Sequence, residues 1–81
     1  METMIRLKIK KEVTSQQEKK VIQLKGVLIS ASFTDIIHIS DEGDEFYVNS
    51  FMTVPNKKHE ILGFINAYLE QQSLNETIWI L

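Results

Sequence analysis

The chain of 81 residues contains no cysteine, one proline and three glycines. Without cysteine, no disulfide can stabilise the fold and no thiolate can act as a nucleophile or a metal ligand. Gly26, Gly43 and Gly63 lie far apart in the sequence. They therefore form no glycine-rich loop of the kind that holds a phosphate group.

Histidine is also scarce, since only His38 and His59 are present. Neither has a second histidine or a carboxylate at the spacing of a metal-binding motif, and no serine or threonine stands near a histidine in a nucleophile motif. The sequence therefore predicts no catalytic, metal or cofactor site and no small-molecule substrate. We expect the protein not to be an enzyme.

Long apolar segments are missing as well. No run of hydrophobic residues approaches the length that crosses a bilayer, and the first residues do not have the pattern of a secretory signal. The expected location is the cytoplasm.

A chain of this length forms one domain, here residues 1–81, and buries only about 60% of the surface that its unfolded form exposes. Because neither disulfides nor metals add stability, association with another subunit is the remaining source of buried area. We therefore expect a homodimer or a complex with a protein partner.

One segment has a clear helical pattern, residues 56–72. Its apolar residues fall within one arc of a helical wheel, while its opposite side is polar. Pro55 precedes it, and Asn56 is a residue type favoured at the N-cap of a helix. The buried stripe is expected to consist of Ile61, Leu62, Phe64, Ile65, Tyr68 and Leu69.

Residues 4–13 form the clearest strand, since apolar and basic side chains alternate along it. Further strands are predicted at 36–40, 45–54 and 77–81. Residues 16–25 allow two interpretations. A capping-box pattern at Ser15–Glu18 favours a helix, whereas the lack of apolar residues in its first turns favours a polar loop and a strand from Lys20, which we prefer. The predicted fold class is α+β: a mainly antiparallel sheet of four to five strands with one amphipathic helix on one face, in ββββαβ order.

The turn Asp41-Glu42-Gly43 predicts a hairpin with a three-residue loop, in which His38 faces Phe46. Such a hairpin has apolar side chains on both faces, and one helix can cover only one of them. The second face must meet another layer, a curled part of the sheet or a second subunit, which favours a partner. A strand that is central in a closed barrel would also have two apolar faces, and both interpretations remain open. The residues of this predicted partner surface are Ile37, Ile39, Tyr47 and Phe51.

Four acidic residues, Asp41, Glu42, Asp44 and Glu45, cluster at the hairpin tip. They lack the spacing of a calcium loop, and an exposed tip cannot separate two carboxyl pKa values for acid–base work. The simple interpretation is a solvated turn. The functional alternative is an acidic projection that docks on a basic surface of a partner.

The opposite charge collects on the first strand, where Arg6, Lys8 and Lys10 share one face and Lys25 is a candidate to join them. This face could contact a nucleic-acid backbone. However, no aromatic residue alternates with these cations, and the isoelectric point is about 5.6. A basic solubilising face is therefore the preferred interpretation.

The leading functional hypothesis is a non-enzymatic binding or regulatory protein that acts through protein–protein contacts. Its sharpest form is an inhibitor of a host enzyme or defence nuclease, encoded by a phage or mobile element. The alternatives are a nucleic-acid-binding accessory protein that uses the basic strand face, and a structural subunit that only forms homo-oligomers.

Overall fold

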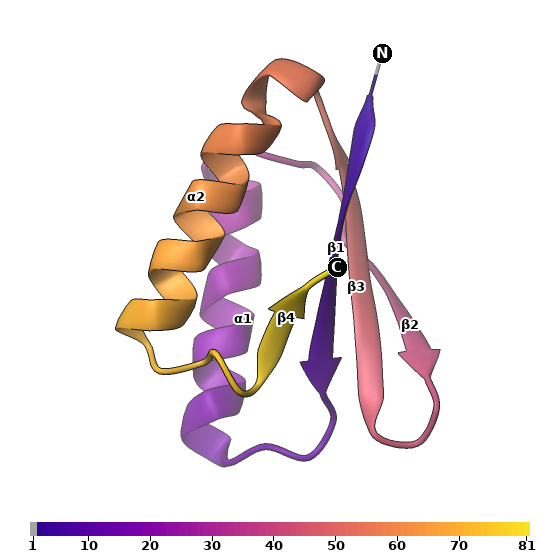
Figure 1. The fold of residues 1–81 in the computed structure, drawn as a ribbon, viewed down its shortest axis with the longest axis vertical. Coiled ribbons are helices and arrows are strands. Elements are labelled where there is room, and N and C mark those ends of the chain that lie inside the picture. Colours follow the sequence, from indigo (N-terminus) through magenta and orange to yellow (C-terminus); the bar gives the residue numbers. More distant parts are fainter. Residues whose placement is uncertain (1) are drawn as a thin grey trace.

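The computed structural model describes residues 2–81. The elements follow in the order β1 (Thr3–Lys10), α1 (Ser15–Ser30), β2 (His38–Glu42), β3 (Phe46–Thr53), α2 (Pro55–Gln71) and β4 (Ile78–Ile80). The four strands form one antiparallel sheet in the order β2-β3-β1-β4, and both helices lie on the same side of it (Figure 1). This is the split β-α-β topology called ferredoxin-like.

The α+β class and the antiparallel sheet are confirmed, but the ββββαβ order and the single helix are wrong. Residues 15–30, expected to begin as a loop and continue as a strand, form α1. The true apolar stripe is Val21, Leu24 and Leu28, all buried, at spacings of three and four residues. Ile22 and Ile29 are exposed. In the sequence they stand next to the buried residues and lengthen the apolar run, which is why this segment was predicted to be a strand.

The first turn of α1 is held by a capping box, one residue earlier than the sequence pattern indicated. The Thr14 hydroxyl accepts a hydrogen bond from the Gln17 backbone N–H at 3.1 Å, and the Gln17 side chain accepts one from the Thr14 N–H at 2.9 Å. These bonds satisfy donors that a helix start leaves free. They explain why the helix begins in a segment with few apolar residues.

Helix α2 matches the predicted segment closely. Pro55 occupies its first turn, where the missing N–H costs nothing, and Val54 is the capping residue without a side-chain hydrogen bond. The expected cap at Asn56 is therefore wrong by two residues. Ile61, Ile65 and Leu69 are buried, as the helical stripe requires.

The hairpin between β2 and β3 is confirmed as a three-residue loop, but its register differs from the prediction. Glu42 faces Phe46 and His38 faces Ser50, so the loop consists of residues 43–45. Gly43 has a φ of 69°, a left-handed conformation that glycine adopts without steric cost. The pairing differs by four positions, which is an even number, and each side chain therefore keeps its predicted face.

The core lies between the helices and the covered face of the sheet. Phe33, Ile37, Leu62, Phe64, Tyr68 and Ile80 pack around it at the periphery. In the part of the chain that the structure describes, no helix is long and apolar enough to cross a membrane. The buried cluster consists of Ile5, Leu7, Ile9, Val21, Leu24, Leu28, Phe51, Ile61, Ile65, Leu69, Leu74 and Ile78.

Two glycines within the helices give a direct test of the helix assignment. A Cβ atom added at Gly26 or Gly63 meets nothing within 4 Å, and alanine favours the helix by about 0.5–1 kcal/mol per site. Gly26→Ala and Gly63→Ala are each expected to raise the free energy of unfolding by that amount in urea denaturation. Gly43→Ala is the control, because its left-handed backbone makes the same change unfavourable by roughly 1–2 kcal/mol. A loss of stability at both helical sites would contradict the helix assignment.

Candidate functional site

The sheet has one covered face and one open face. Residues paired across antiparallel strands share a face, so the register defines both sets. The helices cover the face that carries Ile5, Leu7 and Phe51 (Figure 1). The other side is called the open face below, and its strand residues are Met4, Arg6, Lys8, Lys10, His38, Ser40, Glu42, Phe46, Val48, Ser50, Met52 and Trp79.

A row of three cations runs along the middle of the open face. Arg6, Lys8 and Lys10 alternate along β1, which is an inner strand of the sheet. Arg6 and Lys10 are exposed and Lys8 is half-buried. The predicted basic face therefore exists as a continuous row with a sheet strand on either side of it.

Two aromatic side chains flank this row, one from each neighbouring strand. Phe46 of β3 is paired with Lys10, and Trp79 of β4 is paired with Lys8. The two rings meet edge to face with centroids 5.9 Å apart, and the Lys8 Nζ lies 4.2 Å from the Phe46 ring centroid. Leu81 joins Lys8, Phe46 and Trp79 in lining a shallow groove at this point.

The charge of the open face is opposite in sign to that of the whole chain. Its strand residues include three cations and one carboxylate, that of Glu42 at the far edge. The formal net charge of the chain is −2. Folding therefore separates the two signs of charge and leaves a locally positive surface.

Lys25 does not belong to this surface. It lies on α1, and it borders a cavity between the helix and the covered side of the sheet. Burial lowers the pKa of its ammonium group. Its predicted grouping with Arg6, Lys8 and Lys10 is therefore wrong, because the segment expected to be a strand forms a helix.

The predicted apolar partner surface is divided by the fold. Phe51 is 1% exposed and belongs to the core, and Ile37 packs against that core. Ile39 and Tyr47 remain exposed, at 57% and 39%. Both helices lie on the side of the sheet that carries Ile39, Tyr47 and Phe51 (Figure 1). The uncovered face is therefore the opposite one, and the predicted partner surface loses Ile37 and Phe51.

The acidic residues do gather at the exposed β2–β3 hairpin end, but Asp41 is paired. Its carboxylate contacts the Lys11 Nζ at 2.8 Å, and Lys11 also donates to the Gly43 carbonyl at 3.1 Å. The hydrogen bond with Asp41 raises the pKa of Lys11. Glu42, Asp44 and Glu45 are exposed as well.

Among residues 2–81, no group of three or more histidine, aspartate or glutamate side chains is placed to hold a metal ion. Comparisons of the chain with protein-family models, curated proteins and solved structures found no match.

Sequence reasoning missed Phe46 and Trp79 as neighbours of the cations. No aromatic residue alternates with the cations along β1, and the two rings come from segments 36 and 69 positions beyond Lys10. Their placement depends on strand order, because β3 and β4 both pair with β1. The apolar closing segment 77–81 was the available signal, but its neighbour in the sheet could not be specified.

Proposed function

We propose that this protein binds single-stranded nucleic acid on the open face of its sheet. The observation that carries the proposal is the placement of Phe46 and Trp79 beside the cationic row of β1. Proteins that bind single strands combine cations along the phosphate backbone with aromatic rings on which bases stack. A four-stranded sheet is one established platform for such stacking in RNA recognition, although the fold alone implies no function.

The residues of the open face have different proposed roles, which follow from their chemistry. Arg6 and Lys10 are exposed and are assigned to backbone phosphates, which attract them through charge. Trp79, with 37% of its surface exposed, is assigned to base stacking. Lys8 lies over the Phe46 ring, and its ammonium group can reach a phosphate while its stem supports the aromatic pair.

This arrangement contacts phosphates and the flat faces of bases, and neither carries much sequence information. The expected ligand is therefore an unpaired strand of low sequence specificity. RNA and DNA both offer phosphates and the flat faces of bases. Titrations with oligouridine and oligothymidine strands of equal length show which of the two nucleic acids the protein prefers. A rigid duplex, whose bases are already stacked on one another, is expected to bind more weakly.

The salt dependence of binding tests the cationic row. Three neutralised phosphates on a single strand give a slope of about −2 for log K against log salt concentration. Arg6→Gln combined with Lys10→Gln leaves one cation and is expected to reduce this slope to about −0.7. Fluorescence anisotropy with a labelled oligouridine, measured between low and moderate salt, gives both slopes.

Lys19→Gln combined with Lys57→Gln is the matched control, because both lysines are exposed and lie on helices. This pair makes the same change in net charge and is expected to leave the slope near its original value. Equal losses from the two double variants would mean that binding follows total charge, and would contradict an interface on the open face.

A protein partner is the second candidate function, and the exposure of β2 favours it. All five of its residues are exposed and it forms one edge of the sheet, where unpaired backbone groups can receive another strand. The acidic residues at this edge suit a basic partner, as in the proposed inhibitor of a host enzyme or nuclease. If a folded protein binds no oligonucleotide at low salt, this becomes the proposal to pursue.

A further inference from the structure

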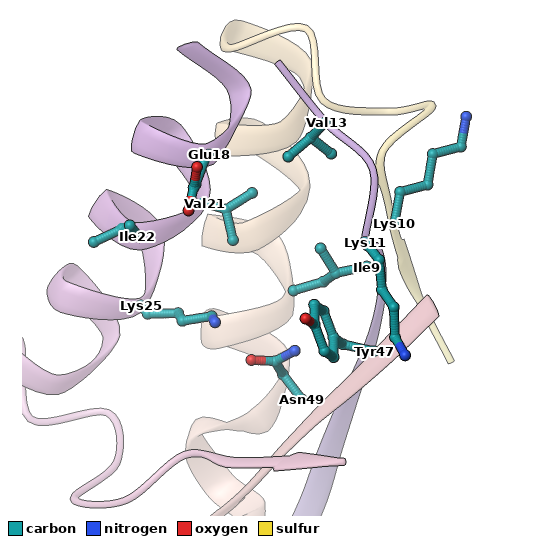
Figure 2. A pocket seen from close by; sticks show the side chains of 10 residues that line it. All are labelled: Ile9, Lys10, Lys11, Val13, Glu18, Val21, Ile22, Lys25, Tyr47 and Asn49. Carbon is teal, nitrogen blue, oxygen red and sulfur yellow. The ribbon is translucent and has the colours of Figure 1, made fainter. Parts of the chain in front are cut away.

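A cavity of about 220 Å³ lies between α1 and the covered side of the sheet, away from the open face. Ile9 of β1, Val21 of α1 and the loop residue Val13 supply apolar walls, and Asn49 of β3 lies at one side (Figure 2). One water takes up about 30 Å³ in the liquid, so the cavity is large enough for a small organic molecule.

The amide of Asn49 is the unusual feature of this cavity. Asn49 is 1% exposed, and neither its Oδ1 nor its Nδ2 has a hydrogen-bond partner among residues 2–81. Buried polar groups nearly always have partners. An amide group offers two N–H donors and one carbonyl acceptor, so a molecule in the cavity that both accepts and donates would satisfy it.

Three lysines, one carboxylate and one hydroxyl complete the polar part of the lining. The ammonium groups of Lys10 and Lys11 extend away from α1 and Asn49, so Lys25 is the lysine whose charge faces the cavity (Figure 2). The Lys25 side chain extends from α1 toward the sheet, and its ammonium group and the Asn49 amide point toward one another (Figure 2). Glu18 borders the cavity from the same helix, and Tyr47 borders it from β3. No hydrogen bond within the described residues 2–81 joins Lys25 to Asn49.

We propose that this cavity binds a free α-amino acid with a short aliphatic side chain. The ligand carboxylate accepts hydrogen bonds from Lys25 and the Asn49 Nδ2, and its ammonium group donates to Glu18 and the Asn49 Oδ1. Its side chain packs against Val21 and Ile9. A zwitterion is favoured over a simple anion because the lining offers a carboxylate as well as an ammonium group.

This site shares one bordering residue, Lys10, with the proposed nucleic-acid surface, and the Lys10 ammonium group extends away from the cavity (Figure 2). Asn49 is on the covered face of β3, whereas Phe46, three residues earlier on the same strand, is on the open face. Either proposal can therefore fail without affecting the other. A ligand between α1 and β3 would nevertheless stabilise the sheet on which the open face depends, by mass action on the folded state.

The test is titration of the ¹⁵N-labelled protein with L-valine, followed through the side-chain amide signals of Asn49 in heteronuclear NMR spectra. Saturable shifts of these signals are expected. Isovalerate and isobutylamine, which each lack one charged group, are expected to bind at least about tenfold more weakly, since a hydrogen bond to a charged group is lost in each case.

Lys25→Met keeps a long unbranched side chain, shorter by the terminal nitrogen, and removes its charge. It is expected to weaken valine binding by about tenfold or more. Lys19→Met on the same helix is the matched control and is expected to leave binding unchanged. Asn49 signals that do not move with valine would overturn the proposal. Equal binding of valine and isovalerate, or equal losses from the two lysine variants, would also overturn it.

Discussion

Replacing Trp79 with alanine is expected to weaken oligonucleotide binding by about 5- to 140-fold. The stacking of one base on an aromatic side chain is worth about 1–3 kcal/mol, and each 1.4 kcal/mol is a factor of ten in affinity. Trp79 is the exposed member of the aromatic pair, beside Lys8. Anisotropy titration with labelled oligouridine at one fixed salt concentration measures the loss.

Two controls separate stacking from general disturbance of the surface. Trp79→Phe retains an aromatic face and is expected to keep most of the affinity. Met4→Ala removes an apolar side chain that is 48% exposed on the same face, but it offers no ring and is expected to have little effect. An equal loss from Trp79→Phe and Trp79→Ala would argue against base stacking. Because the Trp79–Phe46 contact also contributes to the fold, thermal unfolding of each variant must accompany the titration.

Replacing Asn49 with leucine is expected to stabilise the protein in the absence of ligand. A buried polar group without partners costs about 1–3 kcal/mol, and leucine has a similar size and needs no hydrogen bonds. The midpoint of thermal unfolding should rise by about 4–8 °C for each kcal/mol in a domain of this size. Differential scanning calorimetry in amino-acid-free buffer is the appropriate measurement.

Thr77→Val is the matched control for this change. Thr77 is 3% exposed, but its hydroxyl accepts a hydrogen bond from the Gln17 side chain at 3.4 Å. Removal of a partnered hydroxyl is expected to lower stability by about 0.5–1.5 kcal/mol, opposite in sign to Asn49→Leu. Destabilisation by Asn49→Leu would mean that the amide is satisfied in solution. If Asn49→Leu is more stable but no longer binds valine, then Asn49 lowers the stability of the fold and is present because it binds the ligand.

The elements with regular patterns could be predicted from the sequence, and α1 could not. The alternation along residues 4–10 fits only a strand, and the apolar stripe of residues 61–69 fits only a helix. The first turns of α1 instead dock through polar groups. The Lys20 Nζ donates to the Gln72 carbonyl at 3.1 Å, and the Tyr68 hydroxyl donates to the Lys20 carbonyl at 2.7 Å. Apolar periodicity does not reveal such contacts, so the helix looked unsupported.

Only the cationic half of the candidate site could be predicted from the sequence. The cationic row of β1 is local, since alternation along one strand places Arg6, Lys8 and Lys10 on one side. The aromatic half depends on which strands neighbour β1, and a strand order cannot be obtained from periodicity. Asn49 gave no sequence signal, because nothing in its neighbours distinguishes a buried asparagine from an exposed one.

Intrinsic fluorescence offers the most direct test of the central claim, that the open face binds single strands. Trp79 is the only tryptophan in the chain and lies at the proposed stacking position, so its emission reports on the interface itself. Addition of unlabelled oligouridine or oligothymidine at low salt is predicted to quench this emission saturably, with recovery on addition of salt. An emission that stays unchanged at saturating oligonucleotide, in a protein that remains folded, would contradict the account.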